Sequence, residues 1–314
     1  MAATRANETA VLHTFDVGGP LHLDAHLRSS TLSVTAGTVD QITVEVALAK
    51  GVHVNSDPQE VIVEHSAGTL RIEVPETQGG GLKFGPIQIG NFTSHRYHID
   101  VQVPEGSSIR AQAGSGGITA VGRMDSVLAK CGSGRISVEQ AREIYAKAGS
   151  GTITVERAQK LEATAGSGDI TASTLGEAHL TAGSGTLRVG AADHHLELKT
   201  GSGDIRLGRV ASASALAGSG DIEVGELSGQ FSSKTGSGDV TVQRAVSGVV
   251  AATAASGDIS VGIPLGTAVL KDCSTVSGGL SSALDEADGP GEAEQRLELR
   301  ARTVSGDIAV HRAS

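Results

Sequence analysis

The sequence predicts an all-β protein, a parallel β-solenoid (β-helix) of about eleven coils with a β-sheet cap at its N-terminal end. Three observations favour this fold. A Gly-Ser-Gly-Asp-Ile motif, clearest at 166–170, recurs with variations eleven times, apolar and polar residues alternate on both sides of it, and glycines gather at the motif. Units this short cannot bury a face alone, so we expect them to stack on one another.

The strand after the motif is the most regular part of the repeat. The central serines are mostly 17 or 18 residues apart, at Ser115, Ser133, Ser150, Ser167, Ser184, Ser202, Ser219, Ser237, Ser256, Ser277 and Ser305. The third residue after each serine is Ile, Leu or Val, and the fifth is apolar in every coil but one. A period of two indicates a strand with one buried face.

A second strand precedes the motif. The sixth residue before the serine is generally large and apolar, as in Ile109 and Leu161, and the second before it is Ala, Thr or Cys. The glycine after each serine never changes, which predicts a backbone with positive φ at every corner. Parallel crossovers within one sheet are almost always right-handed, so we expect a right-handed coil.

The chain divides, on this pattern, into residues 1–108 and 109–314. The first part lacks the motif but alternates strongly at 21–27, 42–46, 61–63, 70–74 and 97–103, which predicts a smaller antiparallel or irregular sheet that caps the first coil. Residues 78–92, rich in glycine, are expected to form a loop or hairpin. The insertion 282–295 is expected to be a capping loop or, alternatively, a protrusion that binds a partner.

A known family shares these features. The repeated corner, the segment 103–107 (Val-Pro-Glu-Gly-Ser) and the closing segment 302–308 (Arg-Thr-Val-Ser-Gly-Asp-Ile) resemble bacterial β-strand-repeat proteins usually labelled putative adhesins, or a domain of unknown function. The resemblance extends over nearly the whole chain. It implies a β-solenoid without known enzyme activity, and it offers no catalytic residues to carry over.

A column of aspartates is the first candidate site. Six coils carry Asp two residues after the serine, at Asp169, Asp204, Asp221, Asp239, Asp258 and Asp307. Stacked carboxylates could bind a cation, but an Asp at a glycine corner more often accepts backbone N–H bonds, and we favour that structural role. Lys199, Lys234 and Arg302 flank the same corners and could pair with Asp204, Asp239 and Asp307.

Histidines and cysteines supply the remaining candidates. His22, Asp24 and His26 share one face of a predicted strand, a spacing that suits either a metal or an ordinary solvated face. His194 and His195 are expected to be solvated. Cys131 and Cys273 lie too many coils apart for a disulfide, so we expect two buried free thiols, as in a reducing compartment. We predict no cofactor, metal or catalytic residue.

Composition limits the function. The net charge of −10, two Tyr, four Phe and no Trp disfavour nucleic-acid binding, and the sequence has no membrane-spanning stretch or signal peptide, so we expect a cytoplasmic protein that is not inserted in a membrane. We therefore predict a non-enzymatic scaffold that self-assembles through its ends or binds a protein partner. The alternatives are an adhesin-like binding module at the cell surface and, less favoured, a polysaccharide-acting enzyme that uses Asp204, Asp221 and Asp239.

Overall fold

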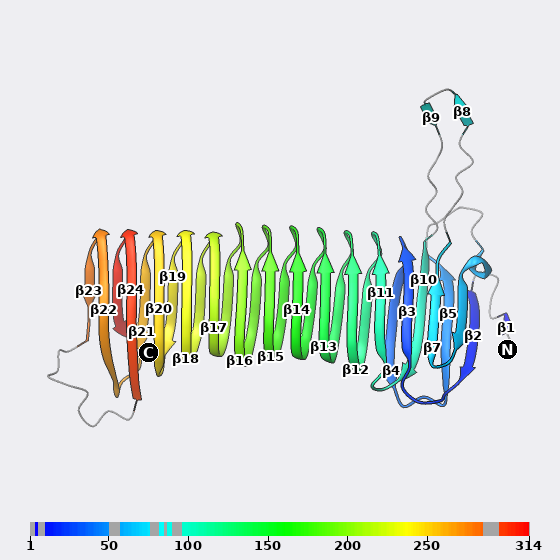
Figure 1. The fold of residues 1–314 in the computed structure, drawn as a ribbon, viewed down its shortest axis with the longest axis horizontal. Helices are drawn as coiled ribbons and strands as arrows, with labels where there is room; N and C mark the ends of the chain where they lie inside the picture. The colour runs from blue at the N-terminus through cyan, green and yellow to red at the C-terminus, as the bar shows by residue number, and fades with distance from the viewer. Residues whose placement is uncertain are drawn as a thin grey trace. The chain divides into compact units, whose positions relative to one another are not determined.

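The computed structural model (Figure 1) describes residues 4–5, 10–49, 57–75, 82–84, 87–89, 96–284 and 295–313. The chain forms two compact units, Met1–Gly151 and Thr152–Ser314. Both are built from β-strands, and the only helical element in the described ranges is the 3-10 turn η1 (Pro58–Glu60). The predicted all-β solenoid is confirmed, and each of the eleven motifs lies where one strand ends and the next begins. The hand of the coil stays a prediction.

The first unit consists of two facing layers of strands. Its strands are β1 (Thr4–Arg5), β2 (Ala10–Asp16), β3 (His22–Arg28), β4 (Thr31–Gly37), β5 (Gln41–Leu48), β6 (Ile62–Ser66), β7 (Thr69–Glu73), β8 (Leu82–Phe84), β9 (Ile87–Ile89), β10 (Tyr97–Pro104), β11 (Ser108–Ala113), β12 (Ile118–Cys131) and β13 (Ile136–Ala148). One layer has the order β1-β2-β5-β10-β4-β12 and the other β6-β7-β3-β11-β12. The long strand β12 bends, so its two halves belong to different layers. β8 and β9 form the antiparallel hairpin predicted within 78–92.

Parallel stacking begins earlier in the chain than the motif does. β3 and β4 pair in parallel with β11 and β12, and the corner between them, Arg28 to Ser30, packs under the first motif at Gly114 to Gly116. Antiparallel pairs are confined to β1–β2, β2–β5, β5–β10 and β6–β7 in this layered part. Parallel coils therefore already occur within residues 1–108, and the capping role of this part stays a prediction.

The second unit is a stack of parallel coils. Its strands are β14 (Ile153–Ala165), β15 (Ile170–Ala182), β16 (Leu187–Thr200), β17 (Ile205–Ser219), β18 (Ile222–Ser237), β19 (Val240–Ala245), β20 (Gly248–Ser256), β21 (Ile259–Ile263), β22 (Thr267–Ser277), β23 (Leu280–Ser282), β24 (Gln295–Ser305) and β25 (Ile308–Arg312). Each strand pairs with the equivalent strand of a neighbouring coil. In β14 and β15, for example, Ile153 is in register with Ile170, and Ala165 with Ala182.

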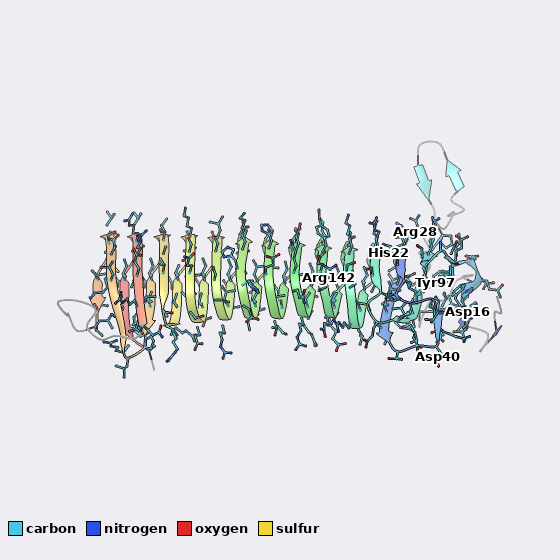
Figure 2. All side chains as sticks on the ribbon, turned by 60° about the horizontal axis from the view of Figure 1, so that its bottom comes forward. Asp16, His22, Arg28, Asp40, Tyr97 and Arg142 are labelled. Carbon is cyan, nitrogen blue, oxygen red and sulfur yellow. The ribbon has the colours of Figure 1, made fainter. Side chains whose placement is uncertain are left out.

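The core of the second unit is a set of apolar columns. Ile153, Ile170 and Leu187, each the third residue after a motif serine, are completely buried, as predicted. A column that the sequence analysis did not identify, with Ala158, Leu175 and Val210, closes the core where the long strands bend. Side chains that alternate with these columns stand in rows outside the stack (Figure 2).

The last two coils are stacked in the reverse of their chain order. β20 pairs with β24 and β21 with β25, while β22 and β23 pair with the outer sides of β24 and β25 (Figure 1). The coil that comes last in the sequence is therefore enclosed, and the coil before it forms the edge. This corrects one prediction: Leu280, expected in the buried column, is 58% exposed because no coil lies beyond it in the described part of the chain.

The reason for glycine at the corners also differs from the prediction. Among the eleven glycines that follow the motif serines, positive φ occurs at five, with values between 149° and 155°: Gly220, Gly238, Gly257, Gly278 and Gly306. At Gly134 and Gly185, whose φ is not in that range, a Cβ would lie 1.9 Å from the carbonyl oxygen of the preceding coil. Close approach of one coil's backbone to the next is therefore the requirement that all these corners share.

Candidate binding surface

The aspartate column holds neighbouring coils together. One oxygen (Oδ1) of each carboxylate accepts a hydrogen bond from the backbone N–H at the same position in the next coil. The N···O distances are 3.2 Å from Asp221 to Asp204, 2.9 Å from Asp239 to Asp221, 2.8 Å from Asp258 to Asp239 and 2.7 Å from Asp307 to Asp258. Asp169 and Asp307 accept equivalent bonds from Thr186 and Gly279. Each carboxylate thus makes the same structural bond between its own coil and the next one.

This arrangement is unlike a catalytic pair. Asp204, Asp221 and Asp239 all accept the same backbone hydrogen bond, whereas an acid and a base need environments that separate their pKa values. Across the described residues, no group of three or more His, Cys, Asp or Glu side chains is arranged to hold a metal ion.

The predicted ion pairs across the corners do not form as expected. Lys199 pairs with Glu197, two residues earlier on the same strand, and Asp204 pairs with Arg206 at 2.8 Å. Arg302 pairs with Asp272 of the neighbouring coil at 3.3 Å. The cause is geometric: the corner turns the chain, so residues on either side of it point in different directions, while residues two apart on one strand share a face.

The structure brings together only two of the three residues in the predicted histidine cluster. His26 Nε2 lies 3.6 Å from Asp24 Oδ1. His22, labelled in Figure 2, is four residues from His26 on the extended strand β3, so the Cα atoms of the two histidines are roughly 13 Å apart. His195 of the predicted solvated pair is exposed and lies 2.8 Å, through Nδ1, from the hydroxyl of Ser212.

Both cysteines are free, but only one is buried. Cys131 Sγ lies 3.0 Å from the carbonyl oxygen of Gly116, taking the place that a threonine hydroxyl takes in other coils, and burial raises the pKa of its thiol. Cys273, predicted to be buried, is partly exposed because it belongs to β22 at the edge; partial burial still raises its pKa. The insertion 282–295 lies mostly outside the described residues.

Exposed apolar side chains gather at the edge of the second unit. We call β22, β23 and the turn between them the end coil (267–282). The large apolar residues exposed in or beside it, which we call the apolar end, are Leu265 (82% exposed), Leu270 (70%), Val276 (83%), Leu280 (58%) and Val304 (56%). Val276 and Val304 lie side by side at a corner position where most coils have glycine.

A lysine crosses the open side of the core in the end coil. Lys271 is in register with Leu299, which is completely buried, so its side chain starts on the core side of the strand. Its ammonium group donates a hydrogen bond of 3.0 Å to the hydroxyl of Ser282, which is in register with the buried Val310. Two positions that are apolar in other coils thus carry a polar link here.

Sequence comparison identifies the family. The model of the Toastrack DUF4097 family matches residues 21–311. The chain belongs to this family. No curated protein matches the sequence. The predicted resemblance to β-strand-repeat proteins labelled putative adhesins is thereby confirmed, although the family model does not test the motif itself.

Several solved structures resemble this Toastrack chain at low identity. A putative adhesin from Parabacteroides merdae is 11% identical, with 75% of this chain and 96% of that one covered and a TM-score of 0.41. A putative lipid binding protein from Parabacteroides distasonis is 13% identical, with 97% of both chains covered and a TM-score of 0.38. A putative cell adhesion protein from Clostridium sporogenes is 8% identical, with 96% and 98% covered and a TM-score of 0.28.

The predicted cytoplasmic location is corrected by these comparisons. The prediction depended only on the absence of a recognisable export segment. Four of the similar structures are named putative adhesin or putative cell adhesion protein, and these names are at odds with a cytoplasmic location. No helix in the described ranges has the length and apolarity needed to span a bilayer.

Proposed function

We propose that this Toastrack protein is a non-enzymatic, adhesin-like binding module of the cell surface, and that it holds a protein partner at the apolar end. The location and the adhesin role are the ones that the names of the similar structures suggest. The place of binding comes from the second unit itself.

The distribution of exposed apolar side chains carries this proposal. Of the nine large apolar residues exposed in the described ranges, five belong to the apolar end, and the rest of the second unit contributes only Leu216. Single exposed apolar residues are normal on a soluble protein, whereas several of them in and beside one coil favour an interaction site. The walls of the stack, with their many charged side chains, lack such a group.

The edge of the sheet favours a partner with an extended segment. Among the strands that the structure describes, β22 pairs only with β24, so its other side presents backbone N–H and C=O groups next to Leu270 and Val276. An added strand could bond to these groups and place its apolar side chains on the apolar end. Self-assembly through this edge, the other mode predicted from the sequence, is disfavoured by Lys271, because a charge on the core side opposes stacking of a second copy.

The test compares adhesion of protein-coated beads to cells. We expect a variant with Leu270→Ser, Val276→Ser and Leu280→Ser to lose at least about 30-fold in apparent affinity, since burying even one leucine contributes about 2 kcal/mol. Leu216→Ser, an exposed leucine on the wall, is the matched control. Equal adhesion of both variants would rule out the apolar end. Protease treatment of intact cells tests the location, since a surface protein is cleaved and an internal one is protected.

A further inference from the structure

The first unit carries a group of cations on an outer sheet face. Neighbouring residues of β11, β12 and β13 are in register there: Arg110 with Leu128, Leu128 with Tyr145, Gln112 with Lys130, and Lys130 with Lys147. Their side chains point away from the core, because the residues between them, such as Ala129 and Ala146, are buried. We call this six-residue block the cationic face.

The three cations of the cationic face, Arg110, Lys130 and Lys147, form no ion pair with any residue that the structure describes. Lys130 and Lys147 stand directly beside each other. Among the acidic residues of the first unit, Asp24 is in register with Arg110, with which it forms no ion pair, and has His26 beside it, and Glu143 pairs with Arg142.

In the second unit, several outward-pointing cations form ion pairs with acidic residues. There, cations on adjacent coils alternate with acids: Lys160 pairs with Glu177, and Glu226 lies between Arg209 and Arg244. Lys199, at the same repeat position as Lys130 and Lys147, pairs with Glu197. Like charges on neighbouring strands destabilise a sheet, so their persistence at the cationic face, in a protein with a net charge of −10, indicates a binding role.

We propose that the cationic face binds the surface of an anionic lipid bilayer. The face is the outside of a β-sheet, where Lys130 and Lys147 are one strand separation (~4.8 Å) apart, and such a flat surface suits a planar array of anionic headgroups. Tyr145, 37% exposed, and Leu128 lie among the cations, and tyrosine favours the boundary between headgroups and acyl chains. The protein lies on the bilayer through this face and does not cross it. This binding is independent of the apolar end.

Co-sedimentation with lipid vesicles tests the proposal. We expect the protein to sediment with vesicles that contain phosphatidylglycerol, to remain in solution with phosphatidylcholine alone, and to be released by salt. Because one lysine near an anionic surface contributes a factor of about five, Lys130→Glu with Lys147→Glu should weaken binding by at least about 25-fold.

The matched control is Lys234→Glu, which changes an exposed lysine at the same repeat position of the second unit, where no ion pair forms either. It should bind like the unmodified protein. Melting curves of all variants check that folding is retained; Tyr145→Ser, which changes no charge, should reduce binding by a smaller factor.

Three outcomes would overturn the proposal. They are no sedimentation with either vesicle, the same loss in Lys234→Glu as in the double variant, and binding to soluble dextran sulfate without binding to vesicles. The last outcome would assign the cationic face to an acidic polymer in place of a bilayer.

Discussion

Replacing Lys271 by leucine should convert the end coil into a surface on which a second copy stacks. In the unmodified protein, the column that includes Phe231, Val250 and Leu299 ends at Lys271, whose ammonium group has the Ser282 hydroxyl as its partner. Lys271→Leu continues the apolar column to the edge, beside the exposed Leu280. Charged residues on the core side of an edge strand are a common protection against edge-to-edge pairing, and this substitution removes it.

The size of the effect follows from what stacking would bury. Two end coils that meet edge to edge bury residue 271 twice. Each leucine contributes about 2 kcal/mol on burial, or about 4 kcal/mol for the pair, which is roughly a 1,000-fold change in the dimer dissociation constant. The unmodified protein must instead desolvate two ammonium groups, at several kcal/mol each, so the true difference should be larger.

Sedimentation velocity over a concentration series measures this change. We expect Lys271→Leu to form dimers at concentrations where the unmodified protein is monomeric. Lys271→Arg keeps the charge and should stay monomeric, and Lys234→Leu places the same new side chain on the wall, where it should not cause association. The reasoning would be refuted if folded Lys271→Leu remained monomeric throughout, or if Lys234→Leu associated as strongly.

Three further predictions concern stability. Gly185→Ala places a Cβ 1.9 Å from a carbonyl oxygen of the neighbouring coil and should cost about 3 kcal/mol or more in thermal unfolding, whereas Gly37→Ala, with no atom within 4 Å, should be nearly neutral. Thr235→Val removes the hydroxyl that donates to the Gly220 carbonyl oxygen and should cost about 1 kcal/mol in urea unfolding; an unchanged midpoint would contradict this bond's contribution. Burial, with smaller effects of nearby carboxylates, raises the pKa of Tyr97 to about 12. The unfolded chain loses this proton first, near pH ~10, so the stability of the folded protein should fall as the pH rises from ~10 to about 12. Tyr97→Phe should abolish that fall.

Regular alternation made most of the fold predictable. The branched residue three after each motif serine is buried in ten coils because a strand in a stack has one inner face, and the sequence repeats that constraint. The exception, Leu280, could not be found in this way, because a repeat specifies that coils stack but does not specify which coil is next to which.

A signal of the reversed order was nevertheless present. The coil of Ser277 is the one that has Lys271 where other coils have an apolar residue six before the serine, and Ser282 where others have one five after it. Two polar substitutions in inner columns of one coil indicate that this coil has a single neighbour. The structural role of the aspartates could be predicted from the chemistry of glycine corners. The partners in the ion pairs could not be predicted, because residue spacing does not specify the direction in which a corner turns the chain.

The reversed order of the last coils also determines how the second unit resists a pulling force. A terminal coil at the edge of a stack could be peeled away by breaking one ladder, bond after bond. A load applied at β25 acts on a coil held between two others, with β21 and β23 on its two sides, and β24 is held in the same way by β20 and β22. Extracting it must shear two ladders at once, so the strand nearest the C-terminal end of the described chain resists removal more strongly than a strand at the edge of the stack would.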